Sequence, residues 1–201
     1  MNNPNGFAYD DFDQTINMLG MKEREMKRIT VLGVGNILFC DEGLGIRVVE
    51  ALDSAYTFSP NVKLVDGGVL GLNLLATLTD SDHLIVVDAV KNGGQPGTLH
   101  RLEGDEIPSR ILAKNSLHQV DLLESLTLCQ ALDHVPETVI IGAEPMDIDT
   151  VSLEMTPPIR EKMDELVHMV CRELERLGAE FWPRDSEEGR HIHVPTENKL
   201  L

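Results

Sequence analysis

Short apolar runs rich in β-branched residues alternate with apolar stripes at helical spacing, and this alternation constrains the fold more than any other feature of the chain. Residues 29–34, 84–87 and 138–142 have the composition of buried strands, and residues 44–52 carry the first helical stripe. Strands that alternate with helices form a mostly parallel sheet, because each helix returns the chain to the edge from which it started. We therefore predict a three-layer α/β/α fold on a mostly parallel, twisted sheet of roughly five strands.

The other predicted strands and helices are indicated mainly by residues typical of their first or last positions. They are strands at 62–65 and 97–102, the second at a sheet edge, and helices at 70–78, from 116 onward and at 156–177. Ser116 begins a capping-box pattern, Ser-Leu-His-Gln, which places His118 in the first turn of its helix. Thr156 and Pro157 are typical of the N-cap and first residue of a helix, and Gly178 is typical of a helix end.

Length and charge limit the domain count and the kind of partner. The chain has 201 residues, and we predict a single domain at 27–183, a flexible N-terminal extension at 1–26 and a charged C-terminal tail at 184–201. Its formal net charge of -17 repels phosphate backbones and anionic lipids, so we expect neither nucleic acid nor a membrane as partner. No apolar run is long enough to span a bilayer, and the first residues are polar, so we expect a cytoplasmic location.

The loop after the first strand, GVGNILFCDEGLG at 33–45, resembles a dinucleotide-binding fingerprint only superficially. The third glycine of that fingerprint is replaced by Leu38, and the acidic pair Asp41 and Glu42 would repel a phosphate. We expect Asp41 to cap the following helix and the helix dipole to keep Glu42 ionised, as a ligand for a cation. The alternative is that both acids only cap the helix.

Three further polar residues mark the same edge of the predicted sheet. Asp88 follows a buried strand, Asp66 ends another, and His118 lies in the first turn of a helix, where the dipole favours the neutral, metal-binding imidazole. Taken singly, Asp66 can be a turn former, Asp88 a cap and His118 a surface residue. Together, Glu42, Asp88 and His118 form an oxygen and nitrogen ligand set that suits a divalent ion such as nickel or zinc.

The sequence resembles a known family, the [NiFe]-hydrogenase maturation endopeptidases. Within it, the resemblance is to the branch that processes the large subunits of uptake-type hydrogenases. The matching segments are GVGNILFCDEGLGIRVVEAL at 33–52, VDGGVLGLNLL at 65–75, DHLIVVDAV at 82–90, PGT at 96–98 and SLHQVDLLESL at 116–126. The similarity covers roughly residues 28 to 180, and its joint motifs are specific.

The resemblance implies an aspartic-type endopeptidase that removes a C-terminal extension from the hydrogenase large-subunit precursor after nickel insertion. It implies that Glu42, Asp88 and His118 bind metal, that this nickel is the precursor's own, and that other divalent metals can substitute for it. The ion could polarise the scissile carbonyl or activate water. Alternatively, Asp88 or Asp66 could act as the catalytic general base.

Two other functions compete with this one. The first is a nickel-sensing checkpoint or chaperone that binds the loaded precursor and has no proteolytic activity of its own. The second is a nucleotide-dependent enzyme, whose affinity for NAD or ATP would survive a Glu42→Ala substitution, whereas a metal site would not. Incubation with nickel-loaded precursor separates the first from a peptidase, because only a peptidase shortens the large subunit.

Overall fold

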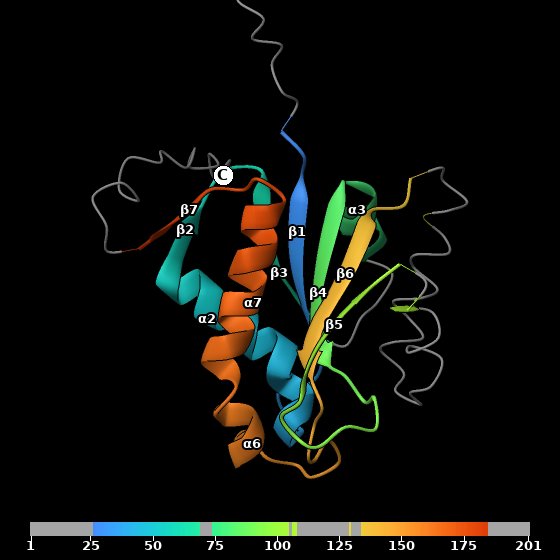
Figure 1. The fold of residues 1–201 in the computed structure, drawn as a ribbon, viewed down its shortest axis with the longest axis vertical. Coiled ribbons are helices and arrows are strands. Elements are labelled where there is room, and N and C mark those ends of the chain that lie inside the picture. Colours follow the sequence, from blue (N-terminus) through green and yellow to red (C-terminus); the bar gives the residue numbers. More distant parts are fainter. Residues whose placement is uncertain (1–25, 69–73, 105, 108–128, 130–133, 185–201) are drawn as a thin grey trace, which may run out of the picture.

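A five-stranded mixed sheet forms the centre of the protein (Figure 1). The computed structural model describes residues 26–68, 74–104, 106–107, 129 and 134–184. The strands lie in the order β3 (Val62–Gly68), β1 (Ile29–Val34), β4 (His83–Ala89), β6 (Glu137–Ala143) and β5 (Leu99–Glu103). All neighbours are parallel except β5, which runs antiparallel to β6 at the edge. The predicted α/β fold, its parallel sheet and the edge position of β5 are confirmed.

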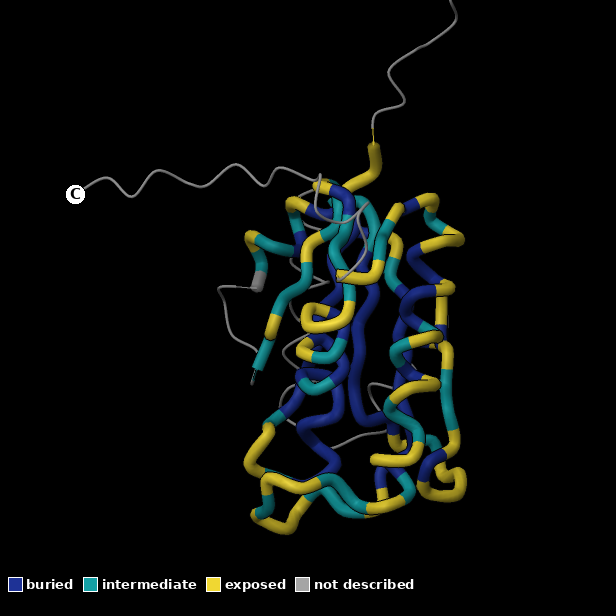
Figure 2. The backbone as a smooth tube through the Cα atoms, turned by 90° about the vertical axis from the view of Figure 1, so that its left-hand side faces the viewer, coloured by how far each residue is buried: buried dark blue, intermediate teal, exposed yellow. Residues whose placement is uncertain are grey.

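Each face of the sheet has its own apolar core, because successive side chains of a strand point to opposite faces. On one face, residues such as Val31, Ile85 and Ile141 pack with helices α2 (Leu44–Ala55) and α7 (Met163–Arg176). On the other face, Leu32 and Val86 pack with α3 (Leu74–Thr79). Figure 2 shows the buried strands passing between exposed and partly exposed segments. The central strand β4 is thus buried on both faces, as its continuous apolar run predicts.

The C-terminal helical region differs from the prediction of one helix over 156–177. The chain forms a short helix, α6 (Pro157–Arg160), and then the longer α7. Between them, the backbone N–H of Lys162 bonds the carbonyl of Ile159, three residues back, which breaks the regular α-helical pattern. The predicted end of the helix is confirmed. Gly178 directly follows the C-cap residue Leu177 and has the positive φ, 78°, that is typical of a helix end.

A second, two-stranded antiparallel sheet lies beside α2 and was not predicted. It pairs β2 (Tyr56–Phe58) with β7 (Phe181–Pro183). The ring of Phe181 lies edge-on to that of Tyr56, with centroids 5.4 Å apart, and tilted to that of Phe58 at 5.9 Å. This ribbon connects the segment after α7 to the segment that follows α2. In the described part of the chain, no helix is long and apolar enough to cross a membrane.

Candidate active site

The four parallel strands all end at one edge of the sheet, the lower edge in Figure 1, and the loops that follow them meet there. The loop after β1 contains the short 3-10 helix η1 (Cys40–Gly43), which leads directly into α2. In open parallel sheets, the carboxyl ends of the strands are where ligands and substrates bind. The predicted site residues in the described part of the chain, Glu42, Asp66 and Asp88, all lie at this edge.

Glycines in the loop after β1 allow the chain to approach the sheet closely. A side chain at Gly45 would place its Cβ 2.0 Å from the carbonyl oxygen of Val87 and 2.5 Å from that of Val34. Gly35 has φ of 129°, and a Cβ there would lie 1.8 Å from the carbonyl oxygen of Glu42. The glycine pattern thus serves to pack η1 and the start of α2 against β1 and β4.

Glu42 and Asp88 are both buried carboxylates, and this packing brings them to the same edge. They are 4% and 3% exposed, and η1, which carries Glu42, packs against β4, which carries Asp88. Asp88 pairs with Gly142 of β6, where a Cβ would lie only 2.0 Å from the Asp88 carbonyl oxygen. Carboxylates are seldom buried so deeply unless they are paired or hydrogen-bonded, because the charge is costly to remove from water.

The third predicted ligand, His118, lies outside the described residues, together with the capping-box helix expected from Ser116 onward. Within the part of the chain that the structure describes, no group of three or more His, Cys, Asp or Glu side chains is placed to hold a metal ion. Of the three predicted ligands, the structure thus describes two, Glu42 and Asp88, and both lie at this edge.

Asp66 has a different environment from the two buried carboxylates. It lies exposed near the end of β3, and its Oδ1 accepts the N–H of Gly68 at 2.9 Å. This is the bond of a turn-forming aspartate, which is one of the two roles that its sequence context allows.

Asp41 does not cap a helix, and this prediction is wrong. Neither η1 nor α2 has a side-chain cap, and the fully buried Asp41 instead binds the loop after β6. Its Oδ2 accepts the N–H of Met146 at 2.9 Å, the N–H of Asp147 at 3.0 Å and the hydroxyl of Thr156 at 2.8 Å. Its Oδ1 accepts the N–H of Thr156, also at 2.8 Å. The hydroxyl of Thr156, the residue expected to cap the last helix, is thus directed to Asp41.

Glu144 is a further buried carboxylate at this edge that the sequence reasoning missed. It follows β6 directly and accepts the backbone N–H groups of Asn92, Gly93 and Gly94 at 2.7, 3.2 and 3.1 Å. Burial alone raises the pKa of Glu144, but these donors and His100, whose Nε2 lies 3.4 Å from Oε2, bring it below its ordinary value. The rule that selected Asp88, an acid directly after a buried strand, would also have selected Glu144.

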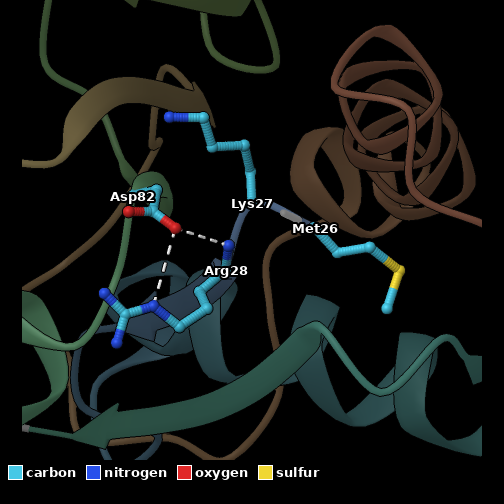
Figure 3. A pocket seen from close by; sticks show the side chains of 4 residues that line it. All are labelled: Met26, Lys27, Arg28 and Asp82. Atoms are coloured by element: carbon cyan, nitrogen blue, oxygen red, sulfur yellow. Dashed lines mark hydrogen bonds and ion pairs between the residues drawn. The ribbon is translucent and has the colours of Figure 1, made fainter. Parts of the chain in front are cut away.

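A hollow at the opposite edge is separate from this site (Figure 3). It has a volume of about 480 Å³ and is lined by Met26, Lys27, Arg28 and Asp82. Asp82 accepts the backbone N–H of Arg28 at 2.8 Å, and this bond is the main reason that the pKa of Asp82 lies below its usual range. These residues precede β1 and β4, so they lie at the amino ends of the strands, away from Glu42 and Asp88.

The fold is thus an α/β fold in which the carboxyl edge of the parallel strands carries buried carboxylates. The family described as "Hydrogenase maturation protease" matches residues 46–173. The hydrogenase expression/formation protein HupD of Rhizobium leguminosarum bv. viciae is 41% identical over 75% of this chain and 76% of its own length. The hydrogenase 2 maturation protease of Escherichia coli K12 is 35% identical over 79% of this chain and 98% of its own.

Solved structures agree with this assignment. The hydrogenase maturating endopeptidase HybD from E. coli superposes with a TM-score of 0.75 at 35% identity, over 79% of this chain and 99% of that chain. The chain therefore belongs to the hydrogenase maturation proteases. It is a hydrolase, an endopeptidase that acts in hydrogenase maturation.

Proposed function

We propose that this endopeptidase removes the C-terminal extension of a [NiFe]-hydrogenase large-subunit precursor after nickel has been inserted. Membership of the maturation protease family supports the reaction. The observation that carries the site is the pair of buried carboxylates, Glu42 and Asp88, at the carboxyl edge of the sheet. This edge is formed by loops, where a chain terminus of a large protein can be received.

The nickel belongs to the substrate, and Glu42, Asp88 and His118 are the side chains that we propose to contact it. Two carboxylate oxygens and an imidazole nitrogen are ligands that nickel accepts, and other divalent ions can use the same atoms. A cation also compensates for the cost of burying two negative charges at one edge. This contact would distinguish a nickel-loaded precursor from a nickel-free one, because only the loaded precursor supplies the ion.

Peptide hydrolysis requires a water molecule to attack the scissile carbonyl carbon while a base takes its proton and the leaving amine gains one. The ion can polarise the carbonyl or lower the pKa of the water. Asp88 can instead take the proton as general base, since it lies buried beside η1. Asp66 is a second candidate base, but its carboxylate is exposed and already holds its own turn. Asp88 is therefore the stronger candidate.

Site variants test these assignments with purified nickel-loaded precursor. Glu42→Gln, Asp88→Asn and His118→Ala should each slow removal of the extension by at least about 100-fold, because each removes a ligand or base that nothing else replaces. The matched control is Glu137→Gln, a carboxylate with an 84% exposed side chain at the amino end of β6, which should process at the wild-type rate.

Two outcomes would contradict the proposal. If Asp88→Asn and His118→Ala process like the wild type, with unchanged thermal melts, these residues have no part in the reaction. If the wild type binds the loaded precursor and leaves its mass unchanged, the chain acts as a checkpoint on nickel insertion and not as a peptidase. Asp66→Asn separates the two candidate bases, because its rate should stay close to that of the wild type.

A further inference from the structure

Large apolar side chains are exposed mainly at the edge that carries Glu42. Among the described residues, seven large apolar side chains are exposed, and five of them belong to the loops that follow β1 and β6. They are Ile37, Leu38, Met146, Val151 and Leu153, which we call the apolar loop surface. The last four are between 53% and 75% exposed. Clustered exposed apolar side chains mark interaction sites more often than single ones do.

The two loops hold each other in place by backbone hydrogen bonds. The N–H of Ser152 bonds the carbonyl of Leu38 at 2.9 Å, and the N–H of Cys40 bonds the carbonyl of Ser152 at 2.9 Å. The carboxylate of Asp41 fixes the start of the second loop through the N–H groups of residues 146 and 147. Binding of a partner here would carry little entropic cost for ordering these loops, because the fold has already ordered them.

The same contacts fix this surface relative to the proposed site. Asp41, which holds the second loop, is the chain neighbour of Glu42 in η1. A protein segment seated on the apolar loop surface would therefore keep a fixed position relative to Glu42. The surface would thus contribute to binding of the precursor beside the proposed site and not to the chemical step.

The second loop also carries negative charge. Hydrogen bonds from the side chain and N–H of Thr150, and then from the N–H of Asp149, lower the pKa of Asp147. Asp149 and Glu154 are exposed on the same loop, and of these two only Glu154 lies near a basic side chain among the described residues, with its Oε2 4.0 Å from Nη1 of Arg160. An apolar segment flanked by Lys or Arg would complement this surface, whereas a second copy of this chain, with a net charge of -17, would be repelled.

We propose that the apolar loop surface is a docking site for a segment of the large-subunit precursor in which apolar side chains are flanked by basic residues. The inference rests on the proposed function for the identity of the partner. Docking is distinct from contact with nickel, so nickel-free precursor should also bind to this surface.

The test is the double variant Val151→Ser with Leu153→Ser, compared with Val135→Ser. Val135 is also exposed, but it lies before β6 at the opposite edge of the sheet. We expect the double variant to raise the Kd for nickel-free precursor at least about tenfold, since two large apolar contacts are lost. It should raise KM for loaded precursor to a similar extent and leave kcat unchanged, because Glu42 and Asp88 are untouched. Val135→Ser should change neither.

The outcomes separate this inference from the proposed function. Wild-type protein that binds the precursor and does not cut it counts against the proposed function, and the change in Kd still tests the surface. An unchanged Kd and KM in the double variant, with an unchanged thermal melt, would overturn the docking site. So would a wild-type dimer in sedimentation that the double variant converts to a monomer with unchanged KM, because the surface would then join two copies of the chain.

Discussion

Replacing Asp41 by Asn should destabilise the protein far more than the loss of a helix cap. The carboxylate is fully buried and accepts four hydrogen bonds, three at Oδ2 and one at Oδ1. The best placement of the new amide keeps its oxygen at the Oδ2 position and turns an NH2 group toward the N–H of Thr156. One charge-assisted bond is then lost, which costs about 1.5–3 kcal/mol.

The three bonds that remain also weaken, because they no longer end on a charge. Charge-assisted bonds are roughly twice as strong as neutral ones, so each should lose about 0.75–1.5 kcal/mol. The total is about 4–7 kcal/mol in the free energy of unfolding, against about 1 kcal/mol for a typical N-cap. Such a loss is a large part of the free energy of unfolding of an ordinary domain, which is roughly 5–15 kcal/mol.

Urea unfolding of the wild type, Asp41→Asn and Thr156→Val measures this difference. Thr156→Val removes one charge-assisted bond, that of the hydroxyl donor, so it should cost about 1.5–3 kcal/mol and serve as the graded control. A loss below about 1 kcal/mol for Asp41→Asn would refute the reasoning, because it would fit a cap and not a buried carboxylate that joins two loops.

Two further predictions concern close packing and pH. Gly45→Ala should destabilise the protein by about 3 kcal/mol or more in urea unfolding, because its Cβ would meet the Val87 carbonyl at 2.0 Å, whereas Gly94→Ala, whose nearest contact is 3.4 Å, should cost less than about 1 kcal/mol. Glu144→Gln should lower the melting temperature at pH 7, because it removes about 1–3 kcal/mol from the free energy of unfolding. Since the pKa of Glu144 is lower in the folded state, its contribution is present above the ordinary value near 4.5 and is lost as the pH falls further. The difference between this variant and the wild type should therefore shrink in melts below about pH 4.5, and a constant difference would contradict the assignment.

The sheet could be predicted because its signal is local. Strand composition and the alternation of strands with helices are properties of neighbouring residues, and they gave the strands, the central place of β4 and the edge place of β5. The two-stranded sheet of β2 and β7 gave no such signal, because each strand is only three residues long and its partner lies at the other end of the domain. Its aromatic residues were the available clue.

The place of an acidic residue at the carboxyl edge of the sheet was predictable where position along a strand decides it. Asp88 was selected because it follows a buried apolar run, and Glu144 would have been found by the same rule. The role of Asp41 could not be read in this way, since its partners lie 105 to 115 residues further along the chain. A side chain that can cap a helix can equally bind a distant loop, and only tertiary structure decides between them.

The most direct test of the proposed function is the intact mass of the large-subunit precursor after incubation with the purified wild-type protein. With nickel-loaded precursor, the mass should fall by that of the C-terminal extension, and the released peptide should appear in the same spectrum. Nickel-free precursor should keep its full mass under the same conditions. A loaded precursor that keeps its extension, or an empty one that loses it at the same rate, would contradict the proposal that this chain is a nickel-dependent processing peptidase.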